Sequence, residues 1–272
     1  MSDRLQVRKT YKLYVGGAFP RLESGRTYPV ESVNVAMASR KDARDAVVAA
    51  RTAFGGWSRA TAYNRGQVLY RVAEVLESRR AEFAELADSA EVDAAIDRWV
   101  WYAGWADKLA QVLGATNPVA GPYFTFSLPE PTGVVAVLAP QSSPLLGLVS
   151  VLAPVIVSGN TAVVVASEQR PLPAVTLAEV LATSDVPAGV GNVLTGRTAE
   201  LAPVLAAHLD VNAIDLTGLP AGSAADLERA AADNLKRVLR PPKAEPDWTE
   251  EPDLTRMTAF LETKTVWHPI GI

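Results

Sequence analysis

Apolar residues recur at helical spacing along the first third of the chain and in short continuous runs along the rest. Residues 39–57, SRKDARDAVVAARTAFGGW, predict an amphipathic helix because their apolar positions share one face. Ser39 and Asp42 form an S-x-x-D cap at its start, and Gly55 and Gly56 predict its end. The stretch YKLYVGG before this helix predicts a short strand and a turn.

Two further helices are expected, one from about Tyr63 and one over residues 93–113, and the second contains a cluster of aromatic side chains. The cluster consists of Trp99, Trp101, Tyr102 and Trp105. Such rings could form a stacking surface for nucleic-acid bases, but basic residues do not interleave with them. We therefore expect the aromatic cluster to pack in the hydrophobic core.

From residue 133 onward, short apolar runs alternate with helical segments. The runs expected to form strands are residues 133–140, 160–167, 191–196 and 211–218, and the helices expected between and after them are residues 145–157, 171–184, 198–208 and 222–238. This alternation is typical of βαβ crossovers and of a parallel sheet that helices cover on both faces. The predicted fold class is α/β, a doubly wound parallel Rossmann-like sheet preceded by N-terminal helices.

Residues 121–132, GPYFTFSLPEPT, have a different pattern. Polar and apolar side chains alternate between Tyr123 and Leu128, and prolines flank the run. This arrangement predicts a strand that is exposed on one side or lies at a sheet edge.

The composition excludes several classes of function. The formal net charge is −4 and there are only two histidines, so we expect neither a nucleic-acid surface nor a metal site. The absence of cysteine excludes a disulfide scaffold, a cysteine-ligated metal and a thiol nucleophile. The first residues lack an apolar signal core, and the longest apolar run, residues 145–157, is too short to span a bilayer. We expect a cytoplasmic protein without membrane contacts.

Ligands of doubly wound sheets bind beyond the carboxyl ends of the strands, so the loops after the strands form the candidate site. None contains G-x-G-x-x-G or a Walker A sequence. Gly196 and Gly218 precede helices, where their amides could hold an anion, although a tight turn also requires glycine. Glu168 could bind a ribose hydroxyl or be a solvated acid. Ser142 and Ser143 lack the G-x-S-x-G elbow of a serine hydrolase.

In their order along the chain, these segments resemble the aldehyde dehydrogenase superfamily. The resemblance rests on YVGGAF, RGQVLYRVAEVLESR, PTGVVAVLAP, GNTAVVVASE, VPAGVGNVLTG, AIDLTG and NLKRV, between about residues 11 and 238. It implies an aldehyde dehydrogenase-like nucleotide-binding domain over residues 1–240. It also implies a small β oligomerisation flap, made of a hairpin at about residues 121–132 and the last strand of the chain.

The sequence departs from the family pattern after NLKRV. In the family NLKRV leads into a strand that ends in L-E-L-G-G-K and carries a catalytic glutamate. The catalytic domain with its thiol nucleophile follows that strand. Here LRPPKAEP follows, so Arg240 or Pro241 replaces the glutamate, and the pair Pro241-Pro242 stops the strand. Residues 241–253 are therefore expected to be a linker in place of the catalytic domain. Residues 254–272 contain ETKTVW, which resembles the family's C-terminal oligomerisation segment.

The loops that hold the cofactor in the family are also altered. Ser142 stands where the family has an oxyanion asparagine, Val165 replaces a ribose-binding lysine, and Leu219 replaces a serine near the pyrophosphate. Two lost contacts of about 1.5–3 kcal/mol each lower the affinity by about two to four decades. We therefore expect no cofactor, or NAD(P) bound weakly. The residues that would hold it are Ser142, Ser167, Glu168, Gly196 and Gly218.

The resemblance implies a non-catalytic subunit that forms a hetero-oligomer with a full-length aldehyde dehydrogenase. The alternatives are an NAD(P)-binding subunit that contributes to aldehyde oxidation within a complex, an esterase activity, a free nucleotide-binding module, and a homo-oligomer. The expected interface residues are Tyr123, Phe124, Phe126, Val266, Trp267 and Ile270. We expect the terminal strand to cross to the partner's catalytic domain. Pairing with the hairpin of its own chain is the other possibility.

Overall fold

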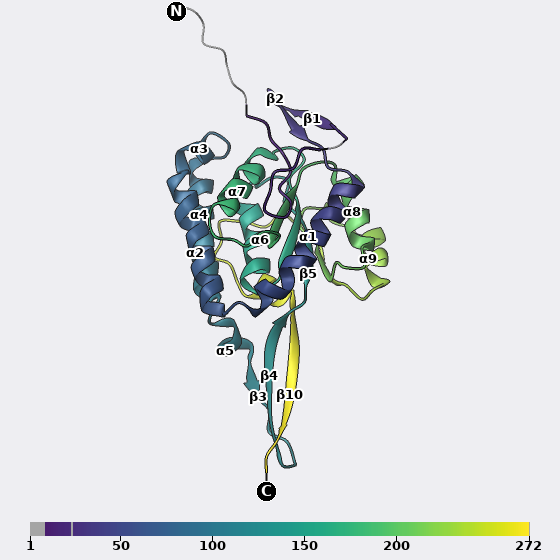
Figure 1. Cartoon of the computed structure of the whole chain (residues 1–272). Helices are drawn as coiled ribbons and strands as arrows, with labels where there is room; N and C mark the ends of the chain where they lie inside the picture. Colours follow the sequence, from purple (N-terminus) through teal and green to yellow (C-terminus); the bar gives the residue numbers. More distant parts are fainter. Residues whose placement is uncertain (1–8, 23, 272) are drawn as a thin grey trace, which may run out of the picture.

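The computed structural model describes residues 9–22 and 24–271, and it consists of a body and a projecting ribbon (Figure 1). A five-stranded parallel sheet forms the centre of the body, and helices cover both of its faces. A narrow β-ribbon extends from one end of the body. The expected α/β class with a doubly wound Rossmann-like sheet is therefore confirmed.

The central sheet has the strand order β7-β6-β5-β8-β9, and all of its strands are parallel. The strands are β5 (Val134–Leu138), β6 (Thr161–Val165), β7 (Gly191–Leu194), β8 (Ala213–Asp215) and β9 (Arg237–Leu239). The chain moves outward from β5 to β7 and then returns to the other side of β5. Such a reversal places a crevice beyond the carboxyl ends of β5 and β8.

Two hydrophobic layers enclose this sheet. The helices are α1 (Arg40–Arg59), α2 (Ala62–Ser78), α3 (Arg80–Ala84), α4 (Ser89–Trp105), α5 (Leu109–Leu113), α6 (Leu146–Val157), α7 (Leu172–Ala182), α8 (Thr198–Ala207) and α9 (Ala225–Ala232). Val135 and Val137 of β5 face the layer of α6 and α7, which α2 and α4 cover. Val134, Ala136 and Leu138 face the layer of α1, α8 and α9. Both faces of the sheet are thus buried, as its apolar strands predict.

Helix α1 begins as expected but ends later than its glycine pair predicts. The Ser39 hydroxyl accepts a hydrogen bond from the Asp42 amide, and the Asp42 carboxylate accepts one from the Ser39 amide. The helix then continues to Arg59. The Trp57 side chain explains this extension, because it is buried and its indole Nε1 donates to the carbonyl of Ile156 at 2.9 Å. The last turn is therefore held against α6.

The helix expected over residues 93–113 is interrupted between α4 and α5, where the chain turns toward the ribbon. The aromatic cluster of α4 lies in the core, as predicted. Trp99 and Tyr102 are fully buried, and Trp101 and Trp105 pack against them partly buried.

The stretch YKLYVGG does not form the expected strand. Tyr14 makes a single bridge to Val193 of β7, and the chain then turns at Gly16 and Gly17, which have φ values of 61° and 82°. The first strands are instead β1 (Thr27–Val30) and β2 (Val33–Ala36), which form an antiparallel hairpin. Because the turn follows the bridge directly, no longer strand develops.

The chain between β9 and α10 (Thr255–Thr258), residues 240–254, is a crossover segment that packs on the body. Trp248 in this segment is only 9% exposed and belongs to the core around α6. The buried Arg98 of α4 donates to the carbonyls of Trp248 and Glu250 at 2.7 and 2.8 Å, and to the Ser150 hydroxyl at 2.7 Å. The residues expected to be a linker are therefore fixed by hydrogen bonds and burial.

A buried ion pair holds the end of this segment to the sheet. Arg256 of α10 lies 3.0 Å from the fully buried Asp215 carboxylate at the end of β8. Thr217 donates to the same carboxylate through both its amide and its hydroxyl. The Arg256 guanidinium also lies 5.3 Å from the ring centroid of Trp248. One side chain thus joins α10, the crossover segment and the central sheet.

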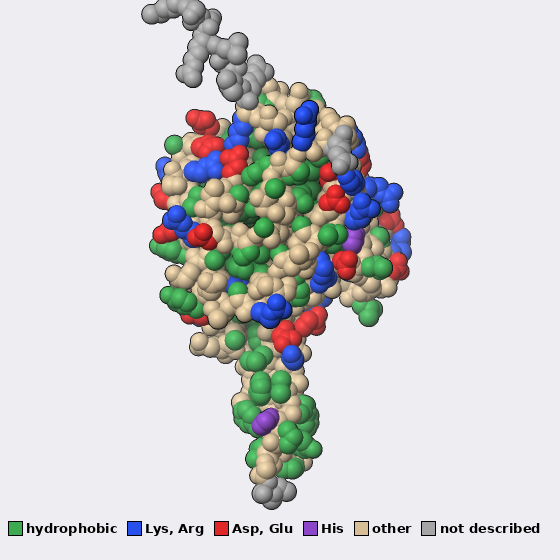
Figure 2. Space-filling view, in the orientation of Figure 1, with side chains coloured by type: hydrophobic (Ala, Val, Ile, Leu, Met, Phe, Trp, Pro, Cys, Tyr) green, Lys and Arg blue, Asp and Glu red, His purple; other side chains and the backbone are tan. Residues whose placement is uncertain are grey.

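The projecting ribbon has the strand order β10-β4-β3. Its strands are β3 (Ala115–Thr116), β4 (Tyr123–Pro131) and β10 (Leu261–Pro269). β10 pairs antiparallel with β4 along its whole length, so the terminal strand pairs within its own chain. The other edge of β10 has no partner strand in the described part of the chain. Hydrophobic side chains gather on the ribbon (Figure 2), and the most exposed of them are Tyr123, Phe124, Leu128, Trp267 and Ile270.

Among the described residues, no helix has the length and apolar composition that a bilayer crossing requires. The cytoplasmic compartment stays a prediction.

Candidate functional site

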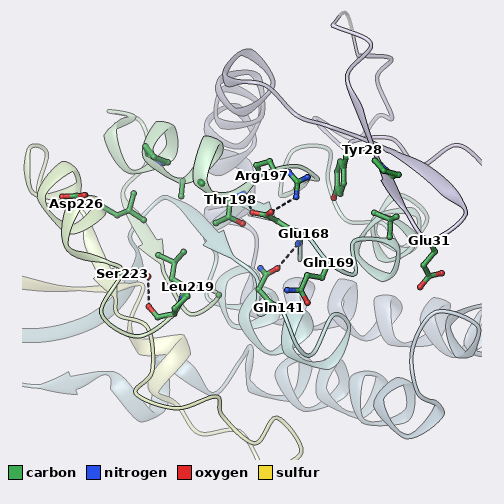
Figure 3. A pocket seen from close by; sticks show the side chains of 18 residues that line it. Tyr28, Glu31, Gln141, Glu168, Gln169, Arg197, Thr198, Leu219, Ser223 and Asp226 are labelled. Atoms are coloured by element: carbon green, nitrogen blue, oxygen red, sulfur yellow. Dashed lines mark hydrogen bonds and ion pairs between the residues drawn. The ribbon is translucent and has the colours of Figure 1, made fainter.

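A cavity of about 870 Å³ opens beyond the carboxyl ends of the central strands (Figure 3). The hairpin β1–β2 closes one side, and the starts of α8 and α9 close the other. Its lining includes Gln141, Glu168, Gln169, Arg197, Thr198, Gly218 and Leu219 from the strand-end loops, and Tyr28, Pro29, Val30 and Glu31 from the hairpin. Cavities of this size hold small organic ligands in other proteins.

Glu168, which follows β6, is engaged by the protein itself. Its carboxylate accepts a hydrogen bond from the Thr198 amide at the first turn of α8, and it lies 3.3 Å from Arg197 Nη1. The Glu168 amide donates to the Gln141 side-chain oxygen at 2.9 Å. A carboxylate at a helix N-terminus satisfies free amides and interacts favourably with the helix dipole. Glu168 therefore acts as an N-terminal cap of α8.

Glu91 occupies the N-terminus of α6 in the same manner. One of its carboxylate oxygens accepts from the Leu145 and Leu146 amides at 3.1 and 3.0 Å, and from the Ser143 hydroxyl at 2.9 Å. The amide groups that an anionic ligand could use at this helix start are thus bonded to a side chain of α4.

The two predicted glycines have structural roles in their turns. The Gly218 amide donates to the carbonyl of Leu138 at 2.9 Å, so this amide does not hold an anion, contrary to our expectation. A Cβ atom at Gly218 would lie 2.1 Å from the carbonyl oxygen of Ala139, which explains the need for glycine. Gly196 has a φ of 147°, a conformation that side chains rarely adopt. Tight turns therefore account for both glycines.

Ser142 and Ser167 do not line the cavity. The Ser142 hydroxyl donates to the Glu245 carboxylate of the crossover segment at 2.5 Å, and Glu245 also accepts from Trp248 Nε1 at 2.9 Å. The buried Ser167 hydroxyl accepts from the Arg170 amide at 3.2 Å and stabilises the loop after β6. Of the five predicted cofactor residues, only Glu168 and Gly218 line the cavity.

Tyr28 is a cavity residue that the sequence did not point to. It is 5% exposed, and its hydroxyl makes no hydrogen bond to any described residue. Burial and the nearby Glu168 carboxylate raise its pKa to about 12, and the Arg197 charge and the nearby Gly196 backbone oppose the rise. The Arg197 guanidinium lies 5.4 Å from the centroid of the Tyr28 ring. Tyr28 therefore stays protonated at neutral pH.

Arg197 and Glu245 are also absent from the site residues that the sequence predicted. Arg197 lies in the loop TGRT beside Gly196, so its position next to a candidate loop was a usable signal. Glu245 lies far from Ser142 along the chain, and no sequence pattern links the two.

No cluster of three or more histidine, cysteine, aspartate or glutamate side chains with metal-binding geometry occurs in residues 9–22 and 24–271.

A family model described as "Aldehyde dehydrogenase family" matches residues 29–240. Retinal dehydrogenase 2 from Homo sapiens is 33% identical over 258 residues, which cover 87% of this chain and 49% of that protein. A putative aldehyde dehydrogenase from Burkholderia cenocepacia superposes with a TM-score of 0.80 at 29% identity, covering 85% of this chain and 50% of that one.

A third similar protein is PnpE from Pseudomonas sp. WBC-3, with a TM-score of 0.80 and 30% identity over 85% of this chain and 50% of PnpE. PnpE has also been solved in complex with nicotinamide adenine dinucleotide. The chain thus spans about half the length of the relatives that it matches.

Proposed function

Because this chain belongs to the aldehyde dehydrogenase family, we propose that it is a non-catalytic subunit that assembles with a full-length family member. In this proposal, residues 1–240 are the aldehyde dehydrogenase-like nucleotide-binding domain and residues 241–253 replace the catalytic domain. The oligomerisation flap consists of residues 254–272 and the segment at about 121–132, which forms the single strand β4 and not the hairpin that the resemblance implies. The partner supplies the catalytic chemistry, and this subunit has a structural or regulatory role.

The main support for the proposal comes from the crossover segment, residues 240–254. It follows β9 directly, at the point where the family pattern leads into a catalytic domain. Its Glu245 binds the hydroxyl of Ser142, the residue in the family's oxyanion position. Trp248 and the Arg256–Asp215 pair then hold the segment against the sheet. The Ser142 hydroxyl is therefore bonded to a side chain of the crossover segment.

The isolated chain is expected to oxidise no aldehyde. It contains no cysteine to form a thiohemiacetal, and Arg240 or Pro241 stands where the catalytic glutamate would lie. The measurement is reduced-cofactor absorbance with NAD and NADP and with short and long aldehydes, and we expect no rate above the protein-free blank. A rate proportional to the concentration of this chain would overturn the non-catalytic assignment.

The cofactor is part of the same proposal. Relatives such as PnpE bind nicotinamide adenine dinucleotide. In this chain the Thr198 and Gly218 amides donate to internal acceptors, and the apolar Leu219 lines the cavity. These observations favour weak or absent NAD(P) binding. If the chain nevertheless holds NAD(P) inside a complex, it would act as the NAD(P)-binding subunit that we consider as the alternative.

The ribbon supports the assembly part of the proposal. The outer edge of β10 presents main-chain donors and acceptors without a partner strand in residues 9–22 and 24–271. Phe124 and Phe126 on β4 lie with ring centroids 5.8 Å apart, and Tyr123 packs edge-on against Trp267 of β10 at 5.7 Å. Strand addition to such an edge gains affinity from main-chain hydrogen bonds and specificity from alternate side chains. A projecting apolar ribbon is typical of an interaction site.

Removing residues 261–272 is expected to abolish association with the full-length family member. The measurement is co-expression of both chains followed by size-exclusion chromatography with light scattering, which also detects a homo-oligomer. We expect Trp267→Ala to weaken the complex by about tenfold or more, because exposed aromatic anchors dominate many interfaces. Tyr63→Ala is the matched control, since Tyr63 is also an exposed aromatic residue but lies on α2. Equal association of the truncated and intact chains would contradict the proposal.

A further inference from the structure

A second cavity lies where the ribbon joins the body, and the proposed function does not use it. We call it the junction cavity, and its volume is about 430 Å³. The end of α1, the starts of α2 and α5, the end of β4 and the start of β10 contribute to its lining (Figure 1). The cavity is therefore bounded by both the body and the ribbon.

The lining of the junction cavity carries an excess of positive charge. It contains two guanidinium groups, those of Arg59 at the end of α1 and Arg65 near the start of α2. Its single carboxylate in the described part of the chain, that of Glu130, pairs at 2.8 Å with Lys264, which does not line the cavity. Neither guanidinium forms an ion pair with a residue that the structure describes. Two positive charges thus lack an anionic partner in a chain whose net charge is −4.

The Arg65 side chain is held in place by the protein itself. Its Nε donates to the carbonyl of Val157 at 3.2 Å, and its Nη1 donates to the carbonyl of Ala60 at 2.6 Å. Carbonyl groups orient a guanidinium but do not neutralise it, and burial lowers the pKa of Arg65. Arginine nevertheless keeps its proton at neutral pH. The Nη2 group makes no hydrogen bond to a described residue, so a fixed and charged donor is available in the cavity.

Most of the remaining lining is apolar. An apolar wall is formed by Phe54, Leu109, Ala110, Pro129, Pro131 and Leu261. Two hydroxyls also line the cavity, those of Ser58 and Ser158, and the Ser158 hydroxyl donates to carbonyls of α6. Few donors are therefore left for the additional oxygens of a phosphate or a sugar. A carboxylate needs fewer donors, and its two oxygens match the planar fork of a guanidinium.

From the two guanidinium groups without anionic partners, the fixed position of Arg65 and the apolar wall, we propose that the junction cavity binds a small carboxylic acid with a compact apolar body. The ionised carboxylate would pair with Arg59 and Arg65. The apolar body would lie against the wall, between Leu109 of the body and Leu261 of the ribbon. This site does not depend on the proposed role as a subunit.

The first test is calorimetric titration of the full chain with benzoate, benzamide and acetate. Benzamide has the ring of benzoate without its charge, and acetate has the charge without the ring. We expect a dissociation constant for benzoate on the order of 0.1–1 mM, with the other two compounds at least about tenfold weaker.

Three outcomes of the titration would overturn the proposal. Absence of benzoate binding at about 10 mM would overturn the site, because its expected affinity is at least about tenfold higher. Benzamide equal to benzoate would show that the guanidinium groups do not select a carboxylate, and acetate equal to benzoate would show that the apolar wall contributes nothing. None of these results bears on the assembly experiment, so the two proposals can fail separately.

Arg59→Gln tests the charge. Arg59 is exposed and makes no hydrogen bond or ion pair to a described residue, so we expect little change in the melting temperature. Benzoate affinity should fall by about fivefold to twentyfold, since one charged partner of the carboxylate is lost. Arg40→Gln is the matched control, because Arg40 is an exposed arginine at the other end of α1 and does not line the cavity. Equal benzoate affinity in Arg59→Gln and Arg40→Gln would contradict the proposal.

Ala110→Leu tests the position of the site without changing any charge. The larger side chain would fill part of the junction cavity from α5, so we expect benzoate affinity to fall by about fivefold or more. Gln111→Leu is the control, since Gln111 is the next residue of α5 and does not line the cavity. If Ala110→Leu binds benzoate as tightly as the unchanged protein, the ligand does not occupy this cavity.

Discussion

Arg256→Met is expected to lower the free energy of unfolding by about 3–5 kcal/mol, since it removes one partner of a buried ion pair. Asp215 is fully buried, and its remaining partner would be Thr217, which donates through its amide and hydroxyl. Methionine keeps most of the apolar volume beside the Trp248 ring. The measurement is urea unfolding of the variant and the unchanged protein, followed by circular dichroism.

The loss in free energy of unfolding caused by Arg256→Met is expected to depend on pH. Burial raises the pKa of the Asp215 carboxyl, and the Arg256 charge and the Thr217 donors oppose that rise. Without Arg256 the folded protein keeps a proton on Asp215 that the unfolded chain releases near the ordinary value of 3.8. The unfolded state then binds fewer protons, so stability falls as pH increases through the window between 3.8 and the raised pKa. The variant should therefore lose more stability at about pH 8 than at about pH 5.

The double variant Asp215→Asn with Arg256→Met is the control for this prediction. Asparagine carries no charge, so we expect part of the lost stability to return and the added pH dependence to disappear. A single variant Arg256→Met within about 0.5 kcal/mol of the unchanged protein would show that the pair does not stabilise the fold.

Arg98→Ala is expected to release the crossover segment without unfolding the body. The Arg98 guanidinium donates to the carbonyls of Trp248 and Glu250, and hydrogen bonds to a charged donor are worth about 1.5–3 kcal/mol each. Local opening of residues 240–254 should therefore become at least about tenfold more frequent. Limited trypsin digestion measures this directly, because Lys243 is the single lysine or arginine within residues 241–253.

A surface variant provides the control for the digestion experiment. Arg80 pairs with Asp93 on the exposed side of α3 and α4, and it does not contact the crossover segment. We expect Arg80→Ala to leave the rate of cleavage after Lys243 unchanged, because exposed ion pairs contribute little to stability. If Arg98→Ala also leaves that rate unchanged, Arg98 does not restrain the segment.

The central sheet was predictable from sequence because its strands are locally unambiguous. The run Val134–Leu138 is apolar at every position, as expected for a strand that is buried on both faces. The end of α1 was not predictable, since it depends on the hydrogen bond from Trp57 to Ile156, about a hundred residues away in sequence. Local rules for glycine give the wrong helix end where a tertiary contact of this kind dominates.

The candidate site was less predictable than the fold for the same reason. Glu168 and Gly218 lie at the cavity because strand ends converge at the carboxyl edge of a parallel sheet. The side chains that engage the other strand-end loops come from distant parts of the chain. Glu91 of α4 accepts from the start of α6, and Glu245 of the crossover segment accepts from Ser142. Tyr28 reaches the cavity from the hairpin β1–β2. The sequence indicated which loops meet, but not which donors in them are already bonded.

The pairing of β10 with β4 also has a consequence for the order of folding. β4 precedes the entire central sheet in sequence, whereas β10 follows it, so their contact closes a long loop of chain. The loop-closure entropy of such pairing slows it relative to local pairing, such as that of β3 with β4. During synthesis, β4 is therefore made before β10. Until β10 has been made, the edge of β4 that β10 covers in the folded protein has no partner strand. During this interval that edge of β4 is open to the terminal strand of a second chain. Synthesis of two chains side by side would therefore favour pairing of β10 with the neighbour's β4 over pairing within one chain.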